Sequence, residues 1–327
     1  MILSDKSEIA ADHAFGKGQF MNETTLHHRL TGKEHWTSKG EVKLFLWNKC
    51  AGDPAATKAT VLFVHGSSMA SQPTFDLDVP GRPDSSAMEF FAGQGYDTWS
   101  VDMEGYGRST KTRDNNAPIA YGAEDCYCAA TYIHGLRGKR PLLVYGISSG
   151  ALRAALFAQN HPDMVARLAL DAMVWTGKGS PTLAERAKKL PEFRAKNRRP
   201  IDRAFVYSIF NRDHPGSAED KVIDAFADAI LALDDSIPNG TYVDMCSNLP
   251  VCDPTKITVP TIVMRGQWDG IASIEDLLEF FKLLPNPDKQ FTVMPGISHA
   301  SFQGKNYELA LHILLSFFSQ PAPVYRG

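Results

Sequence analysis

With 327 residues, the chain can bury a large hydrophobic core, either as one large domain or as a domain with an insertion. Apolar residues at 43% and charged residues at 22% exclude a disordered protein, and a net charge of −3 gives no reason to expect a nucleic-acid partner. No segment approaches the roughly 18 apolar residues of a membrane span and the N-terminus lacks a secretion signal, so we expect a cytoplasmic protein with no membrane partner.

Short apolar runs alternate with amphipathic segments along most of the chain. The runs lie at residues 41–47, 60–64, 97–101, 141–145, 167–171, 260–264 and 290–294. Because strands that alternate with helices form parallel sheets, we predict an α/β fold with a mainly parallel sheet and helices on both faces. A capping box from Ser86 to Glu89 marks the start of one helix. The first 30 or so residues lack this pattern and are expected to form an irregular arm.

One long segment interrupts the alternation. Residues 176–245 contain several helical patterns but no strand-like run, which predicts a helical cap over the carboxyl ends of the strands. The core would then comprise residues 1–175 and 246–327. Charge in the cap is uneven, because residues 176–203 carry nine Lys and Arg residues but only three Asp and Glu residues.

The turn between the predicted strand at 141–145 and the following helix reads Gly-Ile-Ser-Ser-Gly, with Ser148 at its centre. A sharp strand-to-helix turn holds a serine hydroxyl clear of the backbone, and it needs small residues two positions before and after. Ser148 is therefore the candidate nucleophile. The alternative is an ordinary loop in which Ser149 caps the helix.

A serine nucleophile requires a histidine base and a carboxylate that orients it. In a strand-turn-helix setting, the expected chain order is serine, acid, histidine. Asp269 follows one predicted strand and His299 follows the next, so both should lie at the same sheet edge as Ser148. Asp171, at the end of an earlier strand, is the alternative acid. These residues predict a Ser-His-Asp triad.

An oxyanion hole should accompany such a triad. Two aimed backbone N–H groups stabilise a tetrahedral oxyanion by about 3 to 4 kcal/mol per donor. Ser149, directly after the nucleophile, would supply one N–H, and Ser67 would supply the other from the loop that follows the strand at 60–64.

Several motifs together resemble the α/β-hydrolase superfamily over residues 40–175 and 250–320. They are HGSS at 65–68, DMEGYGRS at 102–109, GISSG at 146–150, the strand-end Asp269 and GISHASF at 296–302. The resemblance implies an α/β-hydrolase fold and a serine hydrolase. This chain has Glu104 where the family usually has a lipophilic residue. That side chain would lie near the pocket rim or at the surface, and we expect the surface. More narrowly, residues 75–92 together with VDMEGYGRS at 101–109 are similar to bacterial monoalkyl phthalate (half-ester) hydrolases.

The predicted function is hydrolysis of a small-molecule carboxylic ester through an acyl-enzyme, with no cofactor and no metal. A substrate that carries a free carboxylate would fit the basic cap if one arginine faces inward, whereas solvated helix faces explain these charges equally well. A lactonase, a carbon–carbon bond hydrolase and a ligand sensor without turnover are alternatives. Candidate substrate-binding residues are Ser68, Met69, Trp175, Trp268, Arg186, Arg194, Arg198, Arg199 and Arg203.

The five cysteines are too few for a disulfide scaffold. Cys246 and Cys252 frame a short loop and are close enough in sequence to form a bridge. In a reducing compartment, however, we expect all five to be free thiols.

Overall fold

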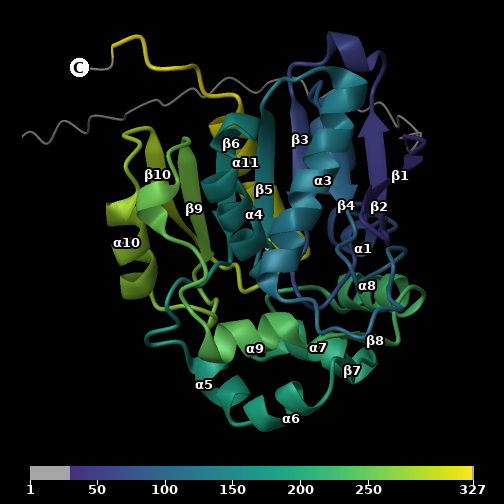
Figure 1. The fold of residues 1–327 in the computed structure, drawn as a ribbon, viewed down its shortest axis with the longest axis vertical. Helices are drawn as coiled ribbons and strands as arrows, with labels where there is room; N and C mark the ends of the chain where they lie inside the picture. Colours follow the sequence, from purple (N-terminus) through teal and green to yellow (C-terminus); the bar gives the residue numbers. More distant parts are fainter. Residues whose placement is uncertain (1–29, 326–327) are drawn as a thin grey trace, which may run out of the picture.

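The computed structural model describes residues 30–325 and has a sheet of eight strands at its centre (Figure 1). These are β1 (Lys33–Lys39), β2 (Val42–Cys50), β3 (Thr60–Val64), β4 (Asp97–Val101), β5 (Leu142–Ile147), β6 (Val165–Asp171), β9 (Thr261–Gly266) and β10 (Lys289–Met294). Their order across the sheet is β1-β2-β4-β3-β5-β6-β9-β10. Strand β2 runs antiparallel to β1 and β4, and the other neighbouring pairs are parallel. The predicted α/β class with a mainly parallel sheet is confirmed.

Strand β1 is the part of the sheet that the apolar runs did not indicate. It pairs with β2 along its whole length, from Lys33 opposite Asn48 to Lys39 opposite Val42. Most of its side chains are exposed or half-buried, because β1 lies at the edge of the sheet. Backbone pairing with β2 defines this strand. Because its side chains are not buried, its sequence contains no apolar run. Residues 1–29 of the expected irregular arm lie outside the described part of the chain.

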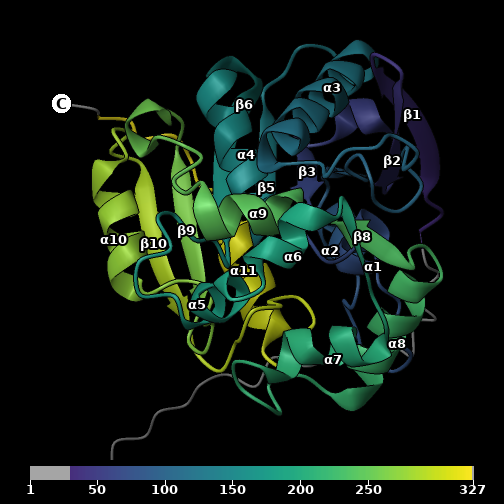
Figure 2. The ribbon, with the colours of Figure 1, turned by 60° about the horizontal axis from the view of Figure 1, so that its bottom comes forward.

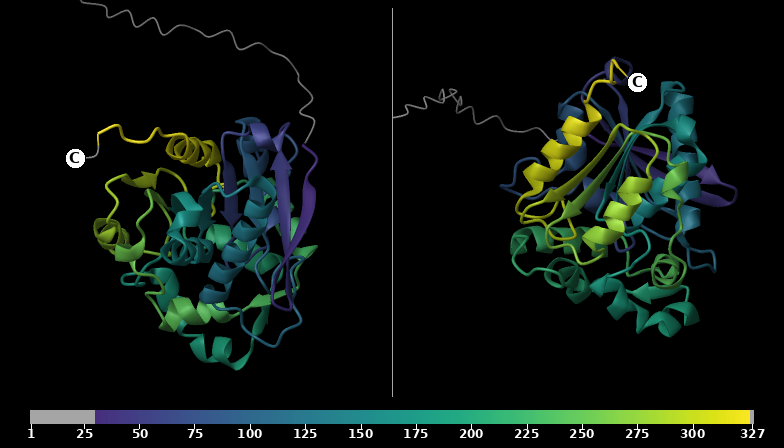
Figure 3. Two further views of the ribbon diagram at one scale, coloured as in Figure 1. Left: turned by 45° about the horizontal axis from the view of Figure 1, so that its top comes forward. Right: turned by 90° about the vertical axis from the view of Figure 1, so that its left-hand side faces the viewer.

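Helices cover both faces of the sheet (Figure 3). One face packs against α1 (Ser71–Phe75), α2 (Ala87–Gly93) and α11 (Tyr307–Phe318), and the other against α3 (Ile119–Arg137), α4 (Ser149–Asn160) and α10 (Ile274–Leu283). Alternate side chains of β3 enter the two cores, with Phe63 on the first face and Leu62 on the second. The predicted helix start is confirmed, because Ser86 caps α2 by accepting the Glu89 N–H at 3.0 Å. Short 3₁₀ helices occupy Pro54–Ala56, Pro162–Met164 and Pro254–Lys256.

Between β6 and β9 the chain leaves the sheet and gathers at one end of it (Figures 1 and 2). This segment forms α5 (Pro181–Ala187), α6 (Leu190–Ala195), β7 (Arg198–Pro200), α7 (Arg203–Asn211), α8 (Asp220–Leu231), β8 (Ser236–Pro238) and α9 (Gly240–Ser247). The expectation that it contains no strand is wrong, because β7 and β8 pair as an antiparallel ribbon. Each has only three residues and ends in proline, too short for an alternating pattern. The expected boundary at residue 246 falls inside α9.

The structure describes the state of the cysteines and the character of the helices. All five cysteines are free, so Cys246 and Cys252 do not form a bridge. Within residues 30–325, no helix combines the length and the apolar character that crossing a membrane requires.

Around Ser148, helix α4 closely approaches both β5 and the end of β3. A Cβ at Gly146 would lie 2.8 Å from the Ala151 Cα, and one at Gly150 would lie 2.7 Å from the His65 carbonyl carbon. Between these glycines, Ser148 has φ 59° and ψ −127°, a backbone conformation that L-residues rarely adopt. The expectation that small residues flank the turn is therefore confirmed.

We expect Gly146→Ala to lower the free energy of unfolding by roughly 1 to 3 kcal/mol, because backbone atoms must shift to admit the methyl group. Gly135→Ala is the matched control, since Gly135 is exposed on α3 and an added Cβ meets nothing within 4 Å. That control should raise stability by up to about 1 kcal/mol. Urea denaturation followed by circular dichroism measures both changes. Equal stability of Gly146→Ala and the unsubstituted chain would contradict the packing argument.

Candidate active site

Ser148 stands at the carboxyl end of β5, directly before the first residue of α4. Its backbone N–H donates to the Asp171 carbonyl at 2.9 Å, which ties the strained turn to the neighbouring strand. Ser148 is partly exposed, although the residues on either side of it are buried. Ser148 is therefore less buried than its neighbours in the turn.

The side chains of Ser148, His299 and Asp269 form one hydrogen-bonded chain. Ser148 Oγ lies 3.0 Å from His299 Nε2, and His299 Nδ1 lies 2.9 Å from Asp269 Oδ1. The network assigns the ring proton to Nδ1, which donates to the carboxylate and leaves Nε2 free to accept from the serine hydroxyl. Asp269 and His299 occupy the loops after β9 and β10, at the same sheet edge as the turn that carries Ser148.

Asp269 is held as an anion in a buried position. Burial by itself raises its pKa, but the charge of His299 and hydrogen bonds from His299 and the Ile271 N–H outweigh burial, so the pKa is lowered. The Ile271 N–H donates to Asp269 Oδ1 at 3.0 Å, the same oxygen that contacts His299. A carboxylate fixed in this way can orient the imidazole and stabilise its protonated form.

Asp171, the alternative acid, lies at the end of β6 and faces a different partner. Its Oδ2 accepts the Tyr145 hydroxyl at 2.6 Å, and the side chain is fully buried. Burial raises the pKa of Asp171 to about 7, despite the hydrogen bonds that favour its anion. No hydrogen bond joins Asp171 to His299 within the described residues.

The loop after β3 lies against the nucleophile. A Cβ added to Gly66 would lie 3.2 Å from Ser148 Cβ and 3.6 Å from Ser148 Oγ, so only glycine leaves this space open. His65 holds the loop in place, because its Nδ1 donates to the Gly66 carbonyl at 2.7 Å and its Nε2 accepts the Met103 N–H at 3.0 Å. Burial, reinforced by the charge of Arg153, lowers the pKa of His65 to about 3, which keeps the ring neutral for this double role.

The two expected oxyanion donors both adjoin the contact between the loop at Gly66 and Ser148. Ser67 follows Gly66 in the loop, and Ser149 is the first residue of α4. Neither backbone N–H has an acceptor within residues 30–325. The two N–H groups thus belong to the segments that meet at Ser148, where a carbonyl oxygen under attack would need donors.

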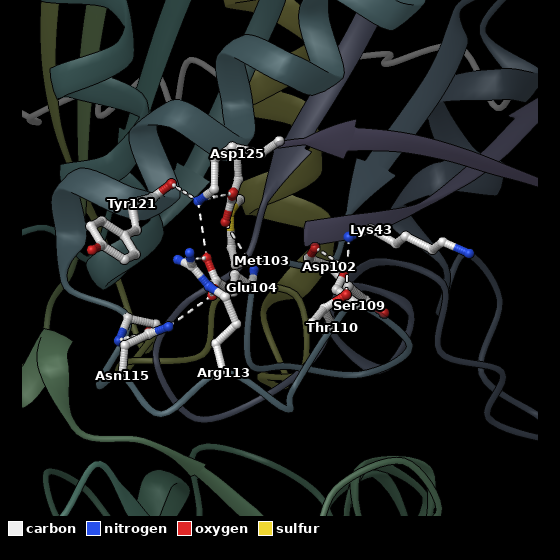
Figure 4. Close-up of polar contacts among 12 residues, drawn as sticks. Lys43, Asp102, Met103, Glu104, Ser109, Thr110, Arg113, Asn115, Tyr121 and Asp125 are labelled. Carbon is white, nitrogen blue, oxygen red and sulfur yellow. Dashed lines mark hydrogen bonds and ion pairs between the residues drawn. The ribbon is translucent and has the colours of Figure 1, made fainter. Parts of the chain in front are cut away.

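Glu104 is buried, which overturns the expectation that it lies at the surface. Its carboxylate accepts hydrogen bonds from Arg113 at 2.7 Å and from Asn115 at 2.9 Å, and it pairs with Lys39 at 3.2 Å (Figure 4). The backbone N–H of Glu104 donates to Asp125 on α3. Burial raises its pKa, but these bonds and the Lys39 charge outweigh burial and lower it. The partners come from β1, a loop and α3, so the sequence around Glu104 does not reveal them.

A family model described as serine aminopeptidase, S33, matches residues 55–306, which include the triad and the loop at Gly66. The chain belongs to this family. It is accordingly a member of the α/β-hydrolase superfamily, as the resemblance of its motifs implied.

A curated relative, the uncharacterized protein YnbC of Escherichia coli (strain K12), is 23% identical over 297 residues. The match covers 89% of this chain and 47% of YnbC, so this chain spans about half the length of that relative.

Several solved structures share the fold. A hydrolase from Pseudomonas aeruginosa PA01 has a TM-score of 0.65 and 15% identity, covering 88% of this chain and 98% of its own. A malate-bound thermophilic esterase from Thermogutta terrifontis has a TM-score of 0.63 and 19% identity, with the same coverage of 88% and 98%. The enol-lactonase from Burkholderia xenovorans LB400 has a TM-score of 0.62 and 16% identity, covering 88% and 100%. At these identities the likeness shows the α/β-hydrolase fold.

Two of the candidate arginines of this S33-family chain converge on one side chain that sequence reasoning missed. Arg186 from α5 and Arg199 from β7 lie over the ring of Tyr242 in α9, with guanidinium carbons 4.2 Å and 3.6 Å from the ring centroid. Arg199 Nη2 also donates to the Ser67 carbonyl at 3.4 Å. Arg199 therefore borders the proposed oxyanion loop, and Arg186 shares the Tyr242 ring with it.

The other three candidate arginines of the cap lie elsewhere. Arg194 is exposed, and Arg203 is an exposed residue that pairs with Asp224 and Asp228. Arg198 donates to the Gly105 carbonyl at 2.9 Å and also contacts Ser236, so it joins the β7–β8 ribbon to the loop after β4. None of these three reaches Tyr242.

The other substrate-binding candidates are divided between the site and the surface. Ser68 is buried and Met69 partly buried in the loop that follows Gly66. Trp268, next to Asp269, is 42% exposed and stacks on His214 at 4.5 Å. Trp175 donates its indole N–H to the Cys252 carbonyl and packs against Phe280.

A second residue missed by sequence reasoning, Asp213, lies beside the triad. Asp213, Asp269 and His299 each place one potential metal-binding atom within 4.8 Å of the others, the one such group among residues 30–325. Asp213 already pairs with Arg212 at 3.2 Å, and Asp269 already bonds to His299 at 2.9 Å. A cation at this point would have to disrupt both pairs, so the arrangement fits the hydrogen-bonded triad better than a metal centre.

Proposed function

We propose that this chain is a serine hydrolase that cleaves carboxylic esters of small molecules through an acyl-enzyme, the reaction of a carboxylesterase. The observation that carries the proposal is the continuous hydrogen-bonded chain from Ser148 Oγ through His299 to Asp269, set on a strained turn. Such a chain activates a serine hydroxyl, which is otherwise a weak nucleophile.

In the proposed mechanism, Ser148 Oγ attacks the ester carbonyl carbon while His299 Nε2 takes the hydroxyl proton. The N–H groups of Ser67 and Ser149 stabilise the negative charge that develops on the carbonyl oxygen. Collapse of the tetrahedral intermediate expels the alcohol, which receives the proton from His299 and leaves an acyl group on Ser148. Water then attacks this acyl group in the same way, with His299 as base and then as acid, and Asp269 orients the imidazole throughout.

We further propose that residues 176–245 act as a helical cap on a core of residues 1–175 and 246–327. Contacts from the β7–β8 ribbon to the core support this division, since Arg198 reaches the Gly105 carbonyl and Arg199 reaches the Ser67 carbonyl. A cap in this position would limit which esters reach Ser148.

We expect fast, saturable release of p-nitrophenol from p-nitrophenyl acetate and butyrate, because the triad needs no further group for this reaction. A spectrophotometric assay measures the rate, and Ser148→Ala supplies the background that does not depend on the nucleophile. Absence of saturable turnover by the full chain would overturn the proposal. A single burst followed by no further release would favour a ligand sensor that keeps the triad without turnover.

Other acyl substrates distinguish related functions of the same site. Faster cleavage of lactones than of open esters would indicate a lactonase, and cleavage of a 1,3-diketone would indicate a carbon–carbon bond hydrolase. Preferred cleavage of alanine p-nitroanilide would indicate the aminopeptidase activity that the family description names.

Within the ester class, we propose half-esters, which carry a free carboxylate, as the favoured substrates. Monoalkyl phthalates are one example. The proposal rests on the basic character of residues 176–203 and on Arg199, which donates to the Ser67 carbonyl and shares the Tyr242 ring with Arg186. The family and the relatives named above support a hydrolase but not this particular substrate.

A further inference from the structure

Two arginines lie over the ring of the buried Tyr242, and a third acts on its phenol electrostatically. Arg186 comes from α5, Arg199 from β7 and Arg212 directly follows α7, while the ring of Phe193 in α6 packs edge-on at 5.2 Å. The first four elements are consecutive in the chain, and α9 (Gly240–Ser247) returns about 30 residues later to pack beside α5 and α6 (Figure 2). A cluster of like charges repels itself, so it needs an anion to stabilise it.

The carboxylates of the chain do not meet that need. Arg212 pairs with Asp213 at 3.2 Å, whereas Arg186 and Arg199 have no carboxylate within ion-pair distance in the described part of the chain. Arg186 Nη1 and Arg199 Nε are buried atoms that have no acceptor among the same residues. Buried donors without acceptors are uncommon in folded proteins, and a guanidinium fork matches the two oxygens of a carboxylate. Repulsion from Arg212 and Arg199 adds to burial in lowering the pKa of Arg186.

A series of short contacts connects this cluster to the nucleophile. Arg186 and Arg199 share the Tyr242 ring, Arg199 donates to the Ser67 carbonyl, and Gly66 leaves its space open beside Ser148. An acyl group on Ser148 would therefore lie beside the loop that Arg199 contacts. Cationic side chains in this place attract an anionic group and disfavour an ammonium group.

We infer that Arg186, Arg199 and Tyr242 form a subsite that binds a carboxylate on the acyl part of the substrate. The ionised phenol of Tyr242 competes with that carboxylate for the two arginines. This inference rests on the proposed ester hydrolase function and adds to it the residues that select the substrate.

Tyr242 acts as a competitor because it titrates in the neutral range. Burial opposes ionisation of the phenol, but the charges of Arg186, Arg199 and Arg212, with a smaller contribution from Ser68, outweigh burial and lower the pKa to about 7. Below that pH the phenol is neutral and the arginines are free to bind a carboxylate. Above it the phenolate offsets one positive charge, so the subsite binds an external anion less strongly.

The first experiment compares kcat/KM for monoethyl phthalate and diethyl phthalate at about pH 6, where the phenol is mainly neutral. We expect a preference for the monoester of roughly ten- to a hundredfold, the range for pairing with a charged group. Arg186→Gln should remove most of it. Arg186 is the better position to replace, because Arg199 also holds the Pro238 carbonyl and the Asn239 side chain. Arg194→Gln is the matched control, since it removes one cap charge at an exposed position.

The second experiment follows the same preference from about pH 6 to about pH 8.5. In the unsubstituted chain the ratio should fall as pH rises through about 7, because the phenolate forms. Tyr242→Phe keeps the ring against Arg186 and Arg199 but removes the ionising group, so its ratio should stay constant. Ionisation of the triad cancels in the ratio, because both esters use the same nucleophile and base.

Hydrolysis of p-nitrophenyl butyrate, measured in parallel, distinguishes a failure of the proposed ester hydrolase function from a failure of the subsite. No turnover of any ester would overturn the proposed function itself. Normal turnover of the butyrate with equal cleavage of monoester and diester would overturn the subsite alone. Loss of the preference in Arg194→Gln as well as in Arg186→Gln would show that general cap charge, not this subsite, attracts the carboxylate. A ratio that still falls with pH in Tyr242→Phe would refute the role of Tyr242.

Discussion

Replacement of Ser148 with alanine should lower ester turnover by about 10⁴- to 10⁶-fold while the protein stays folded. The expected loss is large because the hydroxyl that bonds to His299 Nε2 at 3.0 Å is the only group that could form the acyl-enzyme in this mechanism. Alanine preserves the Cβ and makes no new contact, so the strained turn should persist. Steady-state kinetics with p-nitrophenyl butyrate gives the loss, and circular dichroism checks the fold.

Ser149→Ala is the matched control, because the two serines are neighbours in the same turn. The Ser149 hydroxyl is buried without a hydrogen-bond partner in the described chain, and its proposed role uses the backbone N–H, which alanine retains. The variant should keep most of the activity. A fluorophosphonate probe should label the unsubstituted chain and Ser149→Ala but not Ser148→Ala. An inactive Ser149→Ala beside an active Ser148→Ala would show that the nucleophile is misassigned.

Asp269→Asn should lower kcat by about 10⁴-fold, whereas Asp171→Asn should leave kcat within a few-fold of the unsubstituted chain. Both substitutions conserve side-chain shape and remove one buried carboxylate. Only Asp269 contacts His299 Nδ1, so only its replacement releases the imidazole from its tautomer and orientation. Asp171 instead bonds to Tyr145. Steady-state kinetics of the two variants at one pH tests the assignment, and normal activity of Asp269→Asn would remove that residue from the mechanism.

The free energy of unfolding of Asp171→Asn tests the environment of Asp171 independently of activity. Burial raises the pKa of Asp171 to about 7, above its value in the unfolded chain. The folded state therefore binds more protons than the unfolded state between about pH 4 and pH 7, so the contribution of this carboxyl to stability falls as pH rises through that window. The stability of Asp171→Asn relative to the unsubstituted chain should rise over the same window. Urea denaturation at both ends measures it, and a constant difference would contradict the raised pKa.

Most of the sheet could be predicted from local sequence because its strands are buried on both faces. Runs such as 60–64 and 141–145 are almost entirely apolar, and they fall on strands β3 and β5. Strand β1 has no such run, because an edge strand exposes most of its side chains and is defined by pairing with β2. The β7–β8 ribbon was missed for a related reason, since its strands are too short to show a pattern.

By itself, the sequence determined which residues lie at the carboxyl edge of the sheet. Ser148, Asp269 and His299 each follow a strand. Because parallel strands present their carboxyl ends at one edge, these positions predicted that the three residues lie at the same edge. Tertiary structure decided the contacts between segments that sequence does not relate. Glu104 meets Lys39 and Arg113, and Arg186 meets Tyr242, only because separate elements pack against one another. Pro191 and Pro200 interrupt helical phase in the cap, so no periodic pattern could indicate which arginine faces inward. Local propensity acts over a few residues, whereas a charge cluster of this kind depends on long-range packing.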